Sequence, residues 1–399
     1  MKKTPNVLIV GAGPAGLVSA LVLASAGIAV TVLERNAEIA DDLRASTFHP
    51  PTLDLLARFD ISQQLIAQGL VARYMQQRDR REGVVAQFDM QLLEGLTQHP
   101  FRLQCEQWKL TRLLAARLRT MPNVQLVFDA AVSAVSQDAD GVSVSATVEG
   151  VDTRYTGAWL IGADGAWSTV RRQLDIDFEG FTYPERFVFV STDFEFADHL
   201  RDLSYVNYLS DPQEWCVMLR VPTLWRVLFP TSPDESDESV LSEPAIQSRL
   251  QQIVPRSSDY HTVHRTLYKV HQRVATQFRR GRVFLAGDAA HVNNPLGGMG
   301  MNGGVHDAFS LADMLVSVIN GGADPSILDR YERQRRTIAI EYINASTASN
   351  KKNIEERDPV LRRKNHDELR AIAADPKSAL AYARKISMID AVQRAQAIA

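Results

Sequence analysis

A glycine-rich run near the start of the chain is the first feature whose residue types and spacing can do chemistry. Gly11, Gly13 and Gly16 follow the spacing G-x-G-x-x-G, with Pro14 and Ala15 inside the run. In this pattern the first glycine permits a tight turn, the second lets the backbone approach a pyrophosphate, and the third lets a helix pack on a strand. The diphosphate then lies at the helix N-terminus, where free N–H groups and the helix dipole favour an anion.

The segments on either side of this run give the motif its context. Apolar strands are predicted at 7–10 and 30–33, with a helix at about 14–26 between them. Glu34 follows the second strand, about 20 residues after the glycines, where a carboxylate can accept hydrogen bonds from both hydroxyls of an adenosine ribose. A glycine-rich turn without a ligand would leave Glu34 unexplained. The sequence therefore predicts a dinucleotide-binding site, and Arg35 is expected to belong to it.

Composition and charge narrow the classes of partner. The chain has 399 residues, 45% of them hydrophobic and 23% charged, with a net charge of −3. A nucleic-acid partner is not expected, because phosphate backbones need a basic surface. The stretch 7–33 lacks charged residues, but its glycines divide it into strand, turn, helix and strand, so no membrane segment is expected either. Cys105 and Cys216 have no metal-ligand spacing, which favours a cytoplasmic protein without a metal site.

Two further motifs lie later in the chain. Asp164 and Gly165 stand in the segment Gly-Ala-Asp-Gly, and Gly287 and Asp288 stand in Leu-Ala-Gly-Asp-Ala-Ala-His, which a glycine-rich run follows at 295–302. Together with the first motif, and in this order, they resemble the single-component flavin monooxygenases, the family of para-hydroxybenzoate hydroxylase. The resemblance covers roughly residues 5 to 345. It implies that FAD is the resident cofactor.

The resemblance also implies which residues hold the FAD. Asp288 follows a buried strand and is placed to accept a hydrogen bond from the ribityl chain, although it can also cap a helix. Backbone N–H groups after Pro295 can face the flavin edge where negative charge collects on reduction. Arg44 and Gln107 match positions that face FAD in the family, with a surface role as the alternative. The expected cofactor-binding residues are Gly11, Gly13, Pro14, Ala15, Gly16, Glu34, Arg35, Arg44, Gln107, Val132, Asp164, Gly165, Gly287, Asp288, Pro295, Gly298, Gly300, Met301 and Asn302.

The reaction that the resemblance implies uses NAD(P)H as a transient co-substrate. No second strand–glycine loop–helix unit follows Gly165, and in the family Asp164 is shared between FAD and the incoming NAD(P)H. The reduced flavin adds O2 to form a C4a-hydroperoxide, which hydroxylates a small aromatic, phenolic ring. One alternative is a FAD-dependent dehydrogenase or reductase that inserts no oxygen. Another is a non-catalytic nucleotide-sensing module, and a homodimer is one option for the assembly.

The expected fold is α/β: a Rossmann-like FAD-binding domain, an inserted mixed β-sheet substrate domain and a helical C-terminus. The FAD-binding domain is discontinuous, and its pieces are 1–72, 100–180 and 270–345. The substrate domain consists of 73–99 and 181–269. The segment 346–399 should form two or three helices that pack on the FAD lobe or on a partner subunit. Within the FAD lobe, a small antiparallel unit is predicted from 124–128, 131–135 and 142–148, and a helix from 303 to 319.

The substrate should lie between the flavin and the sheet predicted around 187–229. The catalytic candidates are His199, Tyr205, Tyr208, His49 and Pro295. One of the first four could be the base that deprotonates a phenol and so raises the electron density of its ring. The candidate substrate contacts are Asn207, Trp215, Arg220, which can hold a carboxylate, and Trp225. The opposite parity of each strand stays open, because a one-residue slip exchanges the two faces of a strand.

Overall fold

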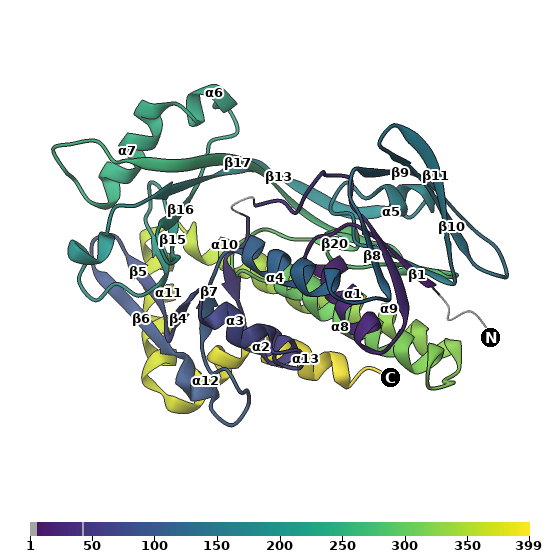
Figure 1. Ribbon diagram of the computed structural model, residues 1–399. Coiled ribbons are helices and arrows are strands. Elements are labelled where there is room, and N and C mark those ends of the chain that lie inside the picture. Colours follow the sequence, from purple (N-terminus) through teal and green to yellow (C-terminus); the bar gives the residue numbers. More distant parts are fainter. Residues whose placement is uncertain (1–5, 42–43) are drawn as a thin grey trace.

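The computed structural model of the chain describes residues 6–41 and 44–399 (Figure 1). Its first lobe is built on a six-stranded sheet with the order β18-β19-β12-β1-β2-β8, in which neighbours are parallel except for β18 against β19. The strands are β1 (Asn6–Val10), β2 (Ala29–Leu33), β8 (Val124–Val127), β12 (Trp159–Gly162), β18 (Arg279–Arg280) and β19 (Val283–Leu285). The predicted α/β class is confirmed.

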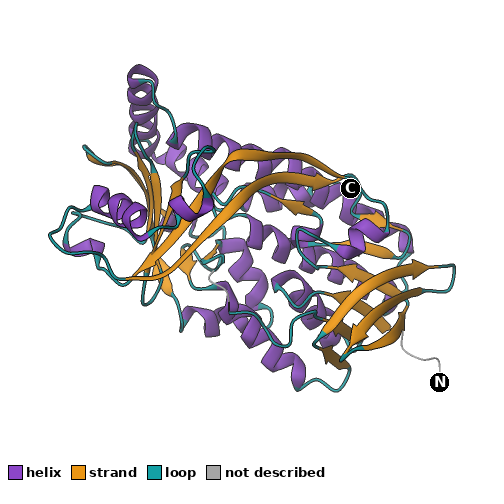
Figure 2. Ribbon diagram, turned by 90° about the horizontal axis from the view of Figure 1, so that it is seen from above, coloured by secondary structure: helices purple, strands orange, loops and turns teal. Residues whose placement is uncertain are grey.

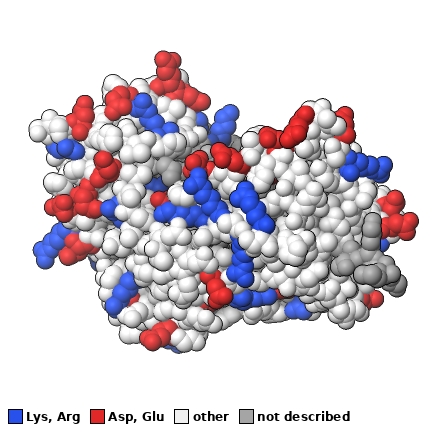
Figure 3. Space-filling view, in the orientation of Figure 1, with Lys and Arg blue, Asp and Glu red and all other residues white. Residues whose placement is uncertain are grey.

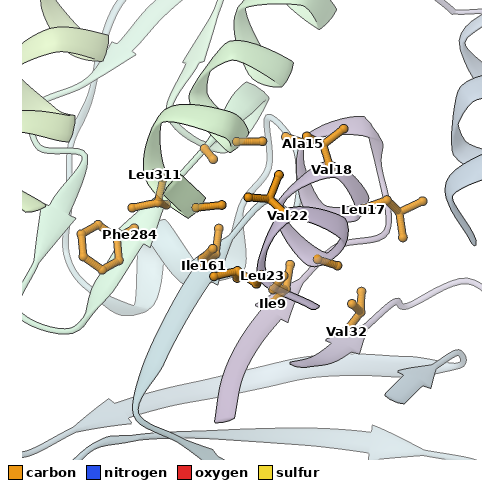
Figure 4. Packing of buried hydrophobic residues seen from close by; sticks show 14 of the residues in the cluster. Ile9, Ala15, Leu17, Val18, Val22, Leu23, Val32, Ile161, Phe284 and Leu311 are labelled. Atoms are coloured by element: carbon orange, nitrogen blue, oxygen red, sulfur yellow. The ribbon is translucent and has the colours of Figure 1, made fainter. Parts of the chain in front are cut away.

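Helices cover this sheet because its strands are apolar on both faces. They are α1 (Pro14–Ser25), α4 (Gln107–Arg119), α5 (Thr169–Gln173) and α8 (Gly300–Ile319). Helix α1 packs against both α4 and α8. Figure 4 shows Val18 and Val22 of α1 with Leu311 of α8, packed beside Ile9 and Ile161 of the sheet. Among the described residues, no helix is long and apolar enough to cross a membrane.

A three-stranded antiparallel sheet lies beside the lobe. It consists of β9 (Ala130–Gln137), β10 (Val142–Val148) and β11 (Val151–Gly157), in the order β11-β10-β9. The prediction that 124–128 belongs to it was wrong: β8 pairs in parallel with β2. A short alternating strand has the same local pattern in either sheet, and a parallel partner far away in the sequence leaves no local signal.

The second lobe contains an eight-stranded sheet in the order β20-β17-β13-β16-β15-β14-β5-β6. Two long strands, β13 and β17, run between the lobes (Figure 2). They cross the predicted domain limits at 181 and 269, whereas β14, β15 and β16 lie wholly within the predicted substrate domain. We propose that the substrate domain has these predicted limits. The strands are β5 (Tyr74–Asp79), β6 (Gly83–Asp89), β13 (Phe178–Thr192), β14 (Val206–Ser210), β15 (Cys216–Arg220), β16 (Trp225–Pro230), β17 (Thr262–Ala275) and β20 (His291–Val292).

The two faces of this sheet have different neighbours. One face packs on α7 (Glu243–Ile253), next to the short helix α6 (Asp237–Val240). The other, here called the inner face, shares an apolar cluster with Leu296 and with the C-terminal helices. The remaining elements are β3 (Thr47–Phe48), β4 (Leu70–Ala72), β7 (Arg102–Gln104), α2 (Pro50–Ala57), α3 (Ile61–Ile66) and the 3-10 turns η1 (Met90–Leu93), η2 (Phe196–Asp198), η3 (Gly287–Ala289) and η4 (Pro325–Ile327).

The C-terminal part is helical, as the sequence predicts, but the segment 346–399 contains four helices rather than the expected two or three. Helix α9 (Leu328–Ile338) continues through a π-helical segment, η5 (Ala339–Asn344), into α10 (Ala345–Ile354), α11 (Pro359–Ala374), α12 (Pro376–Ile386) and α13 (Ile389–Gln396). Helix α13 returns to α9 and α2 in the first lobe. Helices α11 and α12 instead pack on β6 and η1 of the second lobe. The sequence did not indicate this second contact.

Candidate functional site

The first glycine run has the geometry that a pyrophosphate site needs. Gly11 has a φ of +104°, and a Cβ there would collide with the carbonyl oxygen of Ala163. A Cβ on Gly16 would collide with the carbonyl oxygen of Gly11. By contrast, a Cβ on Gly13 would meet no atom within 4 Å, so this backbone faces open space at the N-terminus of α1. Gly11 and Gly16 are therefore required for close packing of the backbone. Gly13 instead borders the open space in which a pyrophosphate could lie.

A groove of about 390 Å³ extends from this run and collects predicted residues from distant parts of the chain. Its wall also contains residues that the sequence analysis missed, among them Ile39, Trp108, Thr111, Trp167 and Thr169. They carry no motif, so only the fold could place them there. The predicted residues that line the groove are Gly11, Gly13, Glu34, Arg35, Arg44, Gln107, Val132, Asp164 and Gly165.

Glu34 is held ready at the edge of this groove. Its Oε2 accepts a hydrogen bond from the backbone N–H of Ala12 at 2.7 Å, and its Oε1 accepts one from that of Asn36 at 3.0 Å. Each carboxylate oxygen has a second lone pair. The two oxygens can therefore still accept both hydroxyls of a ribose, in a position that the backbone already fixes.

Asp164 lines the groove while it caps a helix. Its Oδ1 accepts a hydrogen bond from Ser168 Oγ at 2.5 Å, and its Oδ2 accepts one from the N–H of Thr169 at 2.6 Å. Burial raises the pKa of Asp164, and these hydrogen bonds oppose that shift. Both oxygens of the Asp164 carboxylate thus already accept hydrogen bonds from residues at the start of α5. We keep its contact with FAD and NAD(P)H as a proposal.

Asp288 lies in the turn η3, between the buried residues Gly287 and Ala289. Its side chain remains exposed, yet burial within the surrounding protein raises its pKa, and His291 and Arg44 oppose that shift. Since Arg44 also lines the groove, it connects the groove with Asp288. We keep the contact of Asp288 with the ribityl chain of FAD as a proposal.

A buried ion network fixes the turn that carries Asp288. Asp307 on α8 accepts hydrogen bonds from the backbone N–H of Gly287 at 3.0 Å, from His291 Nε2 at 2.8 Å and from Arg335 Nε at 2.6 Å. Burial would raise the pKa of Asp307, but His291 and Arg335 hold it well below its usual range. The sequence analysis missed Asp307 and Arg335, because nothing in their spacing distinguishes them from ordinary helical charges.

The second glycine run is held against β3. Asn302 donates to the carbonyls of Thr47 at 2.8 Å and Gly298 at 2.7 Å, and it accepts from the N–H of His49 at 2.9 Å. Its side chain thus positions backbone. Helix α8 begins at Gly300, earlier than predicted, so the free N–H groups of its first turn include those of Met301 and Asn302. These donors fit the negatively charged edge of a reduced flavin.

The faces of the substrate sheet overturn part of the predicted set. Trp225 belongs to the cluster on the α7 side, and Arg220, its partner in the register, bonds Glu195 there. Asn207 pairs with Met218 of the same cluster. These three residues point away from the first lobe, because the opposite parity of β14, β15 and β16 faces inward. We therefore withdraw them as substrate contacts.

The remaining candidates divide between the two faces. Tyr208 and Trp215 belong to the apolar cluster of the inner face, together with Leu296 of the second glycine run. His199 is exposed and stacks on Phe194 with ring centroids 5.0 Å apart, on the α7 side. Tyr205 is also at the surface. Of the predicted bases, only Tyr208 lies in the inner cluster, while Pro295 belongs to the glycine run beside it.

Comparison with known proteins agrees with this geometry. The family model for the FAD binding domain matches residues 4–346. The chain is similar to para-nitrophenol 4-monooxygenase of Pseudomonas sp. (strain WBC-3), with 36% identity over 91% of this chain and 90% of that protein. It is equally similar to 6-hydroxy-3-succinoylpyridine 3-monooxygenase HspB of Pseudomonas putida (strain DSM 28022 / S16), with 36% identity over 90% of this chain and 91% of that protein.

A solved structure extends the likeness to the whole fold. The crystal structure of p-nitrophenol 4-monooxygenase PnpA from Pseudomonas putida DLL-E4 superposes with a TM-score of 0.91 at 32% identity, and covers 97% of this chain and 99% of that one. The chain therefore belongs to the FAD-binding-domain family, among the single-component FAD-dependent aromatic hydroxylases. It is a FAD-dependent monooxygenase, as the three motifs predict.

The two kinds of glycine in the first run make a matched test. We expect Gly16→Ala to destabilise the protein even without FAD, because its Cβ collides with the backbone of Gly11. Gly13→Ala should leave the melting temperature of the apoprotein unchanged and weaken FAD binding, because its Cβ points into open space. Thermal melts and FAD titrations of both apoproteins measure this. If Gly13→Ala binds FAD normally, the pyrophosphate does not lie at α1.

Replacing Asp288 should weaken FAD binding without unfolding the protein. The change Asp288→Ala removes one charge-assisted hydrogen bond, worth roughly 1.5–3 kcal/mol, or about tenfold to a hundredfold in Kd. Titration of the apoprotein with FAD measures the loss. Asp313→Ala is the control, since Asp313 pairs with Arg58 at the surface of α8. An unchanged Kd for the Asp288 variant would remove the residue from the site.

Removing Arg335 should destabilise the first lobe. Arg335→Met leaves the buried carboxylate of Asp307 without its cation, which costs about 3–5 kcal/mol of unfolding free energy. Arg333→Met, an exposed change on the same helix, should cost less than about 0.5 kcal/mol. Because the folded pKa of Asp307 is lowered, its contribution in the wild type is present at neutral pH and lost as pH falls below about 4. Urea unfolding at pH 7 and at pH 3, where the contribution of Asp307 should already be reduced, checks both statements.

Proposed function

We propose that the protein uses NAD(P)H and O2 to hydroxylate a small phenol with a single ring. The observation that carries this proposal is the apolar cluster in which Tyr208 of the inner face and Leu296 of the second glycine run lie together. A ring held there would be next to the expected flavin edge. When bound, FAD supplies the redox chemistry, namely electron uptake from NAD(P)H and activation of O2. The two relatives described above are named for reactions on a nitrophenol and on a hydroxylated pyridine.

The side chains on the inner face would hold and orient the ring. Tyr208 is almost fully buried, and its hydroxyl is a polar group there that can hydrogen-bond a phenol. Phe187 and Trp215 pack edge to face, with centroids 5.4 Å apart, and contribute the apolar wall that excludes water. The first-turn N–H groups of α8 stabilise negative charge at the flavin. His49 stays neutral beside them, because burial lowers its pKa well below the usual value.

We further propose that NAD(P)H docks at the Trp167 end of the groove. Trp167 is 73% exposed and lines the groove next to Gly165. His271 lies against its edge, with ring centroids 6.2 Å apart, and burial, Arg273 and Lys269 lower the pKa of His271. An exposed aromatic ring can stack on a nucleobase of NAD(P)H, and cations beside it can bind the phosphates. Figure 3 shows lysine and arginine side chains in the middle of the visible face, with acidic side chains beside them.

The cysteines support a reducing cytoplasm as the proposed location. Cys105 and Cys216 are free and buried, and burial raises the pKa of each thiol to about 12. Such thiols are protonated at neutral pH and react slowly.

Trp167→Ala should impair the donor step selectively. Loss of one stacking surface is worth roughly 1–3 kcal/mol, so KM for the nicotinamide donor should rise about five- to 150-fold. Trp167→Phe should restore most of the affinity, and the Kd for FAD, measured in both variants, separates a loss of the donor from a loss of FAD. Stopped-flow reduction at varied NADH and NADPH concentrations measures the donor step. An unchanged KM with both donors would remove Trp167 from the donor site.

Hydroxylation itself is tested with labelled oxygen. With ¹⁸O₂ and a panel of monocyclic phenols, the product should gain one labelled oxygen atom, and a true substrate should accelerate reduction by NAD(P)H. The acceleration is expected because a bound ring can shift the protein toward the state that is competent for reduction only if it binds that state better. If label appears only in peroxide and water for every compound that is turned over, the protein inserts no oxygen and the proposal fails.

A further inference from the structure

A second cavity, of about 160 Å³, lies between the substrate sheet and the C-terminal helices. Figure 1 shows α10, α11 and α12 near β5 and β6, where the cavity lies. The sheet contributes Gln77, Tyr208 and Ser210, and the helices contribute Asn350, Leu369 and Ile386. No residue of this wall belongs to the nucleotide groove. The two cavities are therefore built from separate parts of the chain.

This cavity connects the protein surface with the second glycine run. Its outer wall contains the exposed side chains of Asn353, Glu368 and Lys385. Its inner wall contains Met299, which is buried within the glycine run. Asn350 also reaches that run, since its Nδ2 donates to the carbonyl of Leu296 at 3.2 Å. A molecule in the cavity is thus in contact with both the exterior and the loop that borders the expected flavin.

The volume and the walls fit one aromatic ring that carries a polar group. A cavity of about 150 Å³ holds one benzene, and this one has about 160 Å³. Leu369, Ile372 and Ile386 provide an apolar side. Hydrogen-bonding groups also line the cavity, including Ser210 of β14 and His366 of α11, whose Oγ and Nε2 lie 3.1 Å apart. A second fused ring would exceed the volume.

We propose that this cavity is the route by which the aromatic substrate reaches the flavin, and that a monocyclic phenol occupies it on the way. The inference rests on the proposed function, and Tyr208 is the link because it borders both the cavity and the inner cluster. The nicotinamide donor uses the groove on the Trp167 side. Separate routes allow the phenol to be bound while the donor arrives and its product leaves.

Filling the cavity should slow the association of the phenol and leave FAD binding and reduction by NADPH unchanged. Leu369→Trp places an indole in the cavity, and Ser349→Trp places one at its exposed mouth. We expect each to reduce the association rate of 4-nitrophenol, followed by the perturbed flavin absorbance, at least tenfold, and to lower kcat/KM equally. The Kd for FAD and the rate of reduction by NADPH without phenol should not change. Arg363→Trp, on the exposed face of α11 and outside the cavity, is the matched control.

Enlarging the cavity provides the converse test. Leu369→Ala should raise kcat/KM for 2-naphthol relative to 4-nitrophenol at least fivefold, because the second ring gains room. Thermal melts identify any variant that fails to fold, and the mouth variant Ser349→Trp does not disturb the interior.

The outcomes separate the two proposals. Wild-type association rates in Leu369→Trp and Ser349→Trp would overturn the access route, even if hydroxylation is intact. If the wild type binds 4-nitrophenol but inserts no oxygen into any phenol, the proposed function fails, while slowed association in the two variants still supports the route. If the wild type binds no phenol, both proposals fail.

Discussion

The buried carboxylate of Asp307 is the constraint on which the cofactor site depends. It receives the N–H of Gly287, the ring of His291 and the guanidinium of Arg335. An unpaired carboxylate at this depth would be very costly, so these partners cannot move independently of one another. Two consequences follow. The turn that carries Asp288 is fixed relative to α8, and α9 is fixed to the same point, from which the chain continues into the C-terminal helices.

Polar contacts also connect the segment after α9 with the substrate sheet and with the second glycine run. After α9, the π-helical segment places the carbonyl of Asn344 3.1 Å from Gln272 Nε2 on β17. Six residues further on, Asn350 donates a hydrogen bond to the carbonyl of Leu296. Strand β17 is one of the two long strands that carry the second lobe. The glycine run, the sheet and the covering helices therefore meet around short polar contacts, and a change in any of them alters the space next to the expected flavin.

The sequence predicts those parts of the site in which cause and effect are close along the chain. The glycine run, Glu34 and the Gly-Asp turn each depend on a strand and a helix next to them, so their spacing is informative. The inner parity of β14 to β16 depends on which cluster each strand joins, and no local pattern records that choice, which is why Asn207, Arg220 and Trp225 were misplaced. The partner of β8 and the packing of α11 on β6 are likewise decided by contacts between distant segments.

The part of the structure that binds the cofactor and the part that selects the substrate also differ in the kind of contact that builds them. The nucleotide groove is built from backbone turns whose glycines and caps leave little freedom to change, as the collisions at Gly11 and Gly16 demonstrate. The second cavity is built from side chains such as Leu369 and Ile372 on α11, which packs on β6 of the second lobe and on α12. Substitutions at well-separated sites act almost independently. The size and polarity of the accepted ring can therefore vary through the C-terminal helices, while the cofactor site and its ion network remain as they are.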